Sequence, residues 1–199
     1  IIAKEPRPGR AKTRLIPRFG PEGSAALAAA ALADTFAAAR ACGAHRVVVA
    51  FDGDPAGIVP PGFDVVPQVA GDLTARLTAA WTHVDGPALQ IGMDTPQVTA
   101  ADLNAAFATL DLPATDAVLG LATDGGWWAL GLREPADVFA GIETSRADTG
   151  RRQLDRLHDL GLATHLLPTR RDVDHPDDVD LVATAAPGTR FAAAARALR

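Results

Sequence analysis

The sequence predicts an α/β fold of three layers, in which helices cover both faces of a mostly parallel, wound sheet. Short apolar runs typical of buried strands alternate with longer segments whose apolar residues recur at helical spacing. Strand, loop and helix follow one another in this order three times within the first 110 residues. Such alternation indicates a wound sheet, because each crossover helix returns the chain to the next parallel strand.

The first predicted crossover begins after the apolar stub Ile1-Ile2. Gly20-Pro21 indicates the start of a helix, since proline is favoured at the first helical position, and Gly43 is its expected C-cap. Residues 46–52 (RVVVAFD) form a β-branched run and are predicted to be a buried parallel strand. A weaker strand is expected over residues 63–69.

The next elements continue the alternation. Asp72 is a predicted N-cap for a helix with apolar residues at positions 73, 77 and 81. Residues 88–93 (ALQIGM) predict another strand. Thr99 and Asp102 form a capping-box pattern at the start of the following helix.

The remaining elements complete the predicted fold. They are strands over 116–122 and 127–132 around the turn 123–126, a helix ending at Gly161, a strand over 163–167, a helix from Pro176 and a terminal helix over 190–199. Neither an internal repeat nor a linker divides the sequence, so we expect one domain over residues 1–199.

Composition narrows the class of protein. At 199 residues and 20.6 kDa, with a net charge of −5, the chain lacks the broad basic face that nucleic-acid binding requires. Cys42 is the only cysteine, which excludes an intramolecular disulfide and makes a cytoplasmic location the default expectation. We expect no membrane span and see no signal peptide.

A basic loop with glycine and proline follows the first predicted strand. Gly9 allows the backbone to approach a ligand closely, and the loop lies at the carboxyl end of a strand, where wound sheets bind their ligands. The alternative is a solvated loop with no function. The position of the loop after the first strand favours the first interpretation, an anion-binding loop for phosphates. Its cations are Lys4, Arg7, Arg10, Lys12 and Arg14.

Carboxylates also follow the predicted strands, at Asp72, Asp94 and Asp124 and at the later pair Asp172 and Asp174. Strand ends converge on one edge of a parallel sheet, and carboxylate oxygens are the ligands that Mg²⁺ prefers. Asp94 is the best metal candidate, because Thr99 already serves as the predicted helix cap. An N-cap role accounts for Asp72 without a metal. For Asp172 and Asp174, a metal-binding role and a local structural role are equally favoured.

The turn Asp124-Gly125-Gly126 leads into Trp127 and Trp128. It is typical of a simple hairpin, but adjacent tryptophans point to opposite faces of a strand, so one of them can floor a pocket. We therefore expect Asp124, Gly125, Gly126 and Trp127 to contact substrate. The sequence contains no nucleophile elbow, dinucleotide fingerprint or complete Walker A motif.

Five ordered motifs resemble a family of bacterial GT-A-type transferases, often described as uncharacterised glycosyltransferases and related in fold to 2-phospho-L-lactate guanylyltransferase. The resemblance covers nearly the whole chain. Its markers are Ala3-Lys4 with Pro6, Pro8-Gly9 and Lys12-Thr13-Arg14-Leu15; Gly71-Asp72-Leu73 with Arg76; Gly92 with Asp94 and Pro96; Asp124-Gly125-Gly126 with Gly131; and Asp172-Val173-Asp174.

The resemblance implies a nucleotide-diphospho-sugar transferase fold. It implies that Lys4, Gly9, Lys12 and Arg14 bind phosphate, that Gly71, Asp72 and Leu73 border the base or ribose, and that Asp94, with Asp174 as second ligand, binds Mg²⁺ or Mn²⁺. In one departure, Trp127-Trp128 stands where the family usually has tyrosine. The chain has no tyrosine, so a pocket hydroxyl is missing.

These observations predict a metal-dependent transferase that takes a nucleotide-activated donor, such as a nucleotide sugar, with Asp94 and Lys12 as catalytic residues. Transfer of a nucleotidyl group with release of pyrophosphate is the nearest alternative. A non-catalytic nucleotide sensor and an interaction module are further alternatives. The donor base, the small-molecule acceptor and the oligomeric state stay open.

Overall fold

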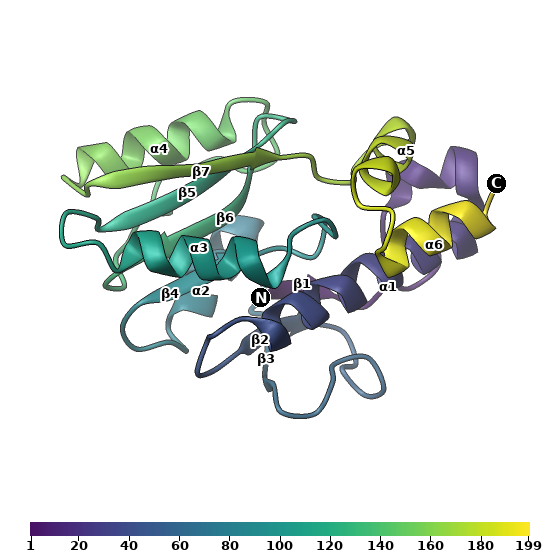
Figure 1. Cartoon of the computed structure of the whole chain (residues 1–199), viewed down its shortest axis with the longest axis horizontal. Helices are drawn as coiled ribbons and strands as arrows, with labels where there is room; N and C mark the ends of the chain where they lie inside the picture. The colour runs from purple at the N-terminus through teal and green to yellow at the C-terminus, as the bar shows by residue number, and fades with distance from the viewer.

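The computed structural model describes residues 1–199 as seven strands in two sheets, with helices packed against them (Figure 1). The three-stranded sheet is parallel and consists of β1 (Ile2–Lys4), β2 (Val48–Asp52) and β3 (Asp64–Pro67) in that spatial order. The four-stranded sheet has the order β4-β6-β5-β7, with β4 (Ala88–Ile91), β5 (Ala117–Ala122), β6 (Trp127–Leu132) and β7 (Thr164–Arg170).

The α/β class and the predominance of parallel pairing are confirmed, but the strands do not form one continuous ladder and β6 runs antiparallel to both of its neighbours. The reason is local. Only residues 123–126 join β5 to β6, whereas a parallel connection needs about a dozen residues. The predicted turn is therefore a hairpin.

The helices are α1 (Ile16–Ala41), α2 (Leu73–Trp81), α3 (Ala100–Leu110), α4 (Thr149–Asp159), α5 (Pro176–Ala185) and α6 (Arg190–Ala197), with a short 3₁₀ helix, η1 (Thr13–Leu15). The helix expected from Gly20-Pro21 is confirmed, because Gly20 has a non-helical backbone (φ 70°, ψ 171°) and Pro21 starts the longer part of α1. A separate helical turn from Ile16 precedes this kink. Asp72 caps α2, and Thr99 with Asp102 forms the predicted capping box of α3.

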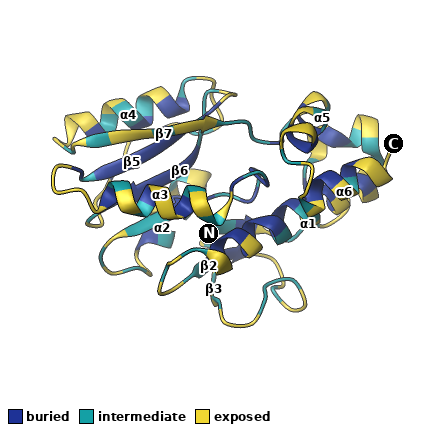
Figure 2. Ribbon diagram, in the orientation of Figure 1, coloured by how far each residue is buried: buried dark blue, intermediate teal, exposed yellow.

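Alternate residues of β5 pack against helices on opposite faces of the four-stranded sheet. Ala117 and Leu119 contact the side covered by α2 and α4, whereas Val118 contacts Ala106 and Leu110 of α3. Figure 2 shows β5 and β6 buried between these layers. This part of the molecule thus has the three layers that the alternation predicts.

Helices α5 and α6 pack against the first half of α1, away from the two sheets (Figure 1). Asp34 of α1 is buried, and its carboxylate accepts backbone N–H bonds from Arg190 (3.0 Å) and Phe191 (2.8 Å) at the start of α6. The C-terminal half of α1 packs on the three-stranded sheet through Leu32 and Phe36. None of the helices is both long enough and apolar enough to cross a membrane.

Candidate functional site

A cavity of about 690 Å³ lies where the carboxyl ends of β1, β4, β5 and β7 meet. This is the edge at which open α/β sheets bind ligands. Of the residues expected to form a site, the cavity is lined by Lys4, Lys12, Arg14, Leu73, Asp94, Asp124, Gly126, Trp127 and Asp174. The other expected residues, Gly9, Gly71, Asp72 and Gly125, do not line it.

The basic loop that follows β1 has some of its cations in the cavity wall and others outside the cavity. Arg7 and Arg10 do not line the cavity, and Arg7 pairs with Glu5 at 2.6 Å. Beyond them, Ala11 and Leu15 are completely buried and anchor the chain on either side of Lys12. Lys12 itself has a left-handed backbone (φ 46°), which directs the chain into η1. Burial of its neighbours thus fixes the backbone that carries the Lys12 ammonium.

Lys12 connects two carboxylates that lie far apart in the sequence. Its Nζ lies 2.9 Å from Oδ1 of Asp94 and 2.8 Å from Oδ1 of Asp174, and only 9% of its side chain is exposed. Arg14 adds a contact of 2.9 Å to the other oxygen of Asp174. Burial acts to lower the pKa of Lys12, but the charges of Asp94 and Asp174 outweigh burial and raise it. The ammonium is therefore charged at neutral pH.

The segment after β7 is held against the segment after β4 by backbone contacts. The N–H of Val173 donates to the carbonyl of Asp94 at 2.9 Å. The carboxylate of Asp178 accepts from the N–H groups of Asp174 (3.2 Å) and His175 (2.7 Å) at the start of α5. Asp178 thereby orients the chain that presents Asp174 to the cavity.

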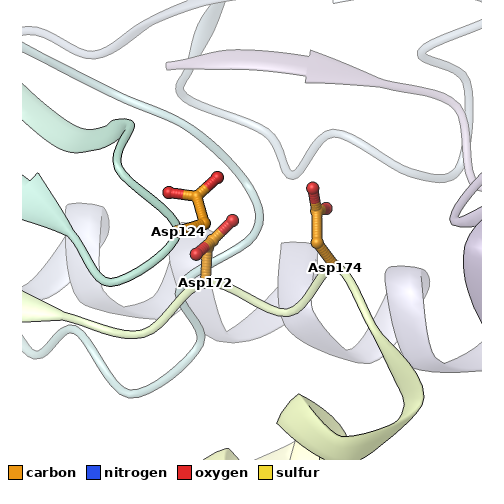
Figure 3. A group of neighbouring side chains, drawn as sticks. All are labelled: Asp124, Asp172 and Asp174. Carbon is orange, nitrogen blue, oxygen red and sulfur yellow. The ribbon is translucent and has the colours of Figure 1, made fainter. Parts of the chain in front are cut away.

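Asp124, Asp172 and Asp174 form an acidic cluster (Figure 3). Asp124 and Asp174 line the cavity, and one carboxylate oxygen from each of the three residues lies within 4.8 Å of the other two. Asp124 comes from the hairpin turn and the other two from the segment after β7. Burial raises the pKa of Asp172 to about 6, and the negative charges of Asp124 and Asp174 add to this. The pKa of Asp174 is lowered instead, because Lys12 and Arg14 outweigh its burial.

This donor set suits a hard divalent cation. Carboxylate oxygens are the preferred ligands of Mg²⁺, and Mn²⁺ shares that preference. No cationic side chain forms an ion pair with Asp124 or Asp172, so their negative charges repel one another. Asp94 lies next to the cluster but is occupied by Lys12.

Close backbone packing fixes the turn that carries Asp124. Gly125 has a φ of 92°, and a Cβ at this position would lie 1.9 Å from the carbonyl oxygen of Ala147. The N–H of Gly150 donates to the carbonyl of Gly125 at 2.7 Å. Gly125 therefore acts by bringing the start of α4 against the turn, and it leaves Gly126 to line the cavity.

The two tryptophans face opposite sides of β6. Trp128 is buried, and its Nε1 donates to the carbonyl of Pro168 at 3.0 Å. Trp127 lines the cavity and stacks on Phe139 with ring centroids 6.2 Å apart. Stacking fixes the orientation of the Trp127 ring at the cavity wall.

At the other end of the cavity, Leu73 and Arg76 of α2 line the wall together with Gln68. The carboxylate of Asp72 accepts the N–H of Ala75 at 2.8 Å and serves as a helix cap. Arg76 donates to Asp52 (3.3 Å) and to Gln68 (3.4 Å). The cap thus positions α2, and Leu73 and Arg76 of that helix form part of the cavity wall.

Sequence reasoning missed several lining residues. Thr144, Ser145 and Arg146 belong to the loop before α4, and nothing in their pattern distinguishes them from a solvated loop. Ser145 has a positive φ of 62°, which the sequence does not reveal. Asp172, in contrast, was a candidate from its position after a strand, but only the fold shows that it lies beside Asp124.

The solved structures that resemble this chain share its fold. A protein from Desulfovibrio desulfuricans G20, named provisionally as a nucleotide-diphospho-sugar transferase, is 26% identical with a TM-score of 0.84, over 99% of this chain and 95% of the other. Rv0371c from Mycobacterium tuberculosis H37Rv, solved in complex with manganese, is 24% identical with a TM-score of 0.53, over 91% and 95% of the two chains.

A more distant structure is 2-C-methyl-D-erythritol 4-phosphate cytidylyltransferase from Thermus thermophilus. It is 17% identical with a TM-score of 0.55, over 94% of this chain and 98% of the other. No curated protein matches the sequence. The model of one family, described as uncharacterized protein conserved in bacteria (DUF2064), matches residues 26–146, which is more than half of the chain. The chain therefore belongs to the DUF2064 family.

Proposed function

We propose that this protein is a metal-dependent transferase, formed by one domain over the whole chain, that takes a nucleotide-activated donor such as a nucleotide sugar. The observation that carries the proposal is the meeting of Lys12 with Asp94 and Asp174 at a cavity lined by further cations. The similarity to the protein from Desulfovibrio desulfuricans supports the same class of reaction.

In this proposal the cations of the opening loop bind the donor phosphates. Lys4, Lys12 and Arg14 line one wall, and each can donate charge-assisted hydrogen bonds to phosphate oxygens. Leu73 and Arg76 border the base or ribose. The cavity has room for such a ligand, since small-molecule sites commonly measure about 300–1,000 Å³.

Mg²⁺ or Mn²⁺ would be held by Asp94 and Asp174, with Asp124 and Asp172 completing the oxygen donors. When bound, such an ion supplies Lewis-acid stabilisation of the charge that develops on phosphate oxygens. The manganese complex of Rv0371c supports this class of ion. Asp178 keeps Asp174 in place through its backbone bonds.

The acceptor would bind on the side formed by Asp124, Gly126 and Trp127, with Gly125 holding the turn in position. Trp127 offers a flat apolar surface against which a sugar or other small molecule can stack. In the step itself, an acceptor hydroxyl oxygen bonds to the anomeric carbon of the nucleotide sugar and releases its proton to solvent, while the bond from that carbon to the nucleoside diphosphate breaks. Lys12 and Arg14 neutralise the charge of the departing diphosphate, so positioning and electrostatics provide the catalysis.

Transfer of a nucleotidyl group, as in a guanylyltransferase or cytidylyltransferase, is the second candidate. It is favoured by the shared fold of the Thermus thermophilus cytidylyltransferase and by a cavity that gathers cations and carboxylates around the phosphate position. The two reactions differ in their products. Release of pyrophosphate indicates nucleotidyl transfer, and release of a nucleoside diphosphate indicates glycosyl transfer.

The proposal is tested first by ligand binding. A thermal-shift panel of nucleoside triphosphates and nucleotide sugars, with and without Mg²⁺ or Mn²⁺, should give a stabilising ligand, because about 100 times the Kd adds about 2.7 kcal/mol. Asp94→Asn should abolish the metal-dependent part of nucleotide binding in calorimetry. Asp85→Asn, at a position outside the cavity, is the matched control. Unchanged affinity in Asp94→Asn would refute the assignment.

A further inference from the structure

The ammonium of Lys12 would compete with a divalent ion for the oxygens of Asp94 and Asp174 that the proposed function assigns to the ion. The Lys12 ammonium contacts Oδ1 of Asp94 and Oδ1 of Asp174 at 2.9 and 2.8 Å. A bound Mg²⁺ would approach such oxygens to about 2.0–2.1 Å. An ion between these two oxygens would therefore overlap the ammonium, and their charges would repel each other.

We propose that the Lys12 ammonium is an exchangeable internal cation, which occupies Asp94 and Asp174 in the empty protein and leaves them when a divalent ion and a nucleotide bind. The inference rests on the proposed function, since it concerns how the ion and the nucleotide enter that site. It assigns Lys12 two successive partners, first the carboxylates and then a donor phosphate.

The local structure lets the ammonium move while the backbone stays fixed. Ala11 and Leu15 are completely buried and hold the chain on both sides of Lys12. The side chain between them is a flexible stem of four carbons that carries a single charge. Rotation about that stem moves the ammonium without disturbing the loop.

Asp174 keeps a partner when Lys12 leaves. Arg14 contacts its other oxygen, Oδ2, at 2.9 Å, and the Asp178 carboxylate holds its N–H at 3.2 Å. Asp94 keeps its backbone contact with Val173. Both carboxylates therefore remain in position with one oxygen released, which is the state that an incoming cation requires.

The consequence is positive coupling between the two ligands. In the empty protein a divalent ion must break two short ion pairs of a buried ammonium, which weakens its binding. A donor phosphate offers the ammonium another acceptor and removes that obstacle. By thermodynamic linkage, the ion must improve nucleotide binding by the same factor.

The first test measures Mn²⁺ binding to the nucleotide-free protein by electron paramagnetic resonance. Lys12→Met keeps an unbranched side chain, one heavy atom shorter, and removes its charge. We expect it to bind Mn²⁺ at least about tenfold more tightly than the wild type, which is about 1.4 kcal/mol. The same substitution should weaken nucleotide binding, so its two effects have opposite signs.

Lys4→Met is the matched control, because Lys4 lines the same cavity but forms no ion pair with a carboxylate. Removing its charge should change Mn²⁺ affinity by less than about threefold, since separated charges are screened by salt. Equal or weaker Mn²⁺ binding by Lys12→Met than by the wild type would overturn the inference. Equal gains of Mn²⁺ affinity in Lys12→Met and Lys4→Met would also overturn it, because they would show a general effect of charge.

A second test uses the wild-type protein and does not depend on a variant that folds. Reductive methylation with formaldehyde, mapped by mass spectrometry, should label Lys12 slowly in the empty protein. Adding Mn²⁺ alone should increase its labelling several-fold, and adding nucleotide as well should protect it again. Labelling that does not respond to Mn²⁺ would overturn the inference.

Failure of the inference can be distinguished from failure of the proposed function. If Mn²⁺ binds the wild type and Lys12→Met gains no affinity, the exchange is wrong while the metal site stands. If neither protein binds Mn²⁺ with or without nucleotide, the metal site and the exchange are both refuted.

Discussion

Asp172 offers a test of the electrostatics of the candidate site. Its carboxylate is partly buried beside Asp124 and Asp174, and its pKa is raised from 3.8 to about 6. The folded protein therefore binds this proton more tightly than the unfolded chain does. As the pH rises and the group ionises, folding becomes less favourable, so Asp172 destabilises the metal-free protein at neutral pH.

The size of this destabilisation follows from the pKa shift of Asp172. At about 1.36 kcal/mol per pKa unit, ionised Asp172 costs about 3 kcal/mol, and solvent screening of this partly exposed group reduces the cost to about 1.5 kcal/mol. At about pH 4.5 Asp172 is protonated in the folded protein, and the cost falls to about 0.5 kcal/mol. Asp172→Asn removes the charge with little change in shape and should recover these amounts.

The assay is denaturation of the wild type and Asp172→Asn in the presence of EDTA at about pH 7.5 and about pH 4.5. We expect the variant to have a Tm about 3–6 °C higher at the neutral pH and a gain about one third as large at the acidic pH. With Mn²⁺ the order should reverse, because the variant loses a metal ligand. A variant that is no more stable at neutral pH, or whose gain does not depend on pH, would refute the reasoning.

Two further substitutions test how the site and the helices are held. Gly125→Ala should cost more than about 3 kcal/mol of folding stability, because its Cβ would meet the carbonyl of Ala147; Gly141→Ala, with a φ of 77° and open space, should cost only about 1–2 kcal/mol. Equal losses would show that the contact with Ala147 does not matter. Asp34→Ala should cost about 2–3 kcal/mol in urea denaturation, since it leaves two N–H groups of α6 without acceptors. Asp180→Ala, which removes only surface ion pairs, should change stability by less than about 1 kcal/mol, and a similar loss in both variants would contradict this account of the cap.

Local pattern was a sound guide to the elements. The run at 46–52 contains β2, and the box of Thr99 with Asp102 caps α3, because both signals depend on residues within one element. The helix start at Gly20-Pro21 is confirmed for the same reason, since Gly20 is non-helical and Pro21 follows it. The extra turn from Ile16, whose neighbours Leu15 and Phe19 pack with residues of α5 and α6, was not predicted.

The candidate site, too, could be predicted only in part from the sequence. Cations after one strand and carboxylates after others are enough to make Lys12, Asp94 and Asp174 candidates from the sequence. The same pattern gives no means of separating Lys12 from Arg7, which lies in the same loop but pairs with Glu5 outside the cavity. Only burial of Ala11 and Leu15 selects which cation turns inward.

Residue pattern was enough to predict the α/β class, the strand ends that carry charge and the types of ligand those charges suit, because periodicity and residue chemistry are local properties. Only the tertiary contacts show that Asp172 meets Asp124 and that one ammonium lies between Asp94 and Asp174. These outcomes depend on contacts between residues far apart in the chain, and such contacts are set by the packing of the whole fold.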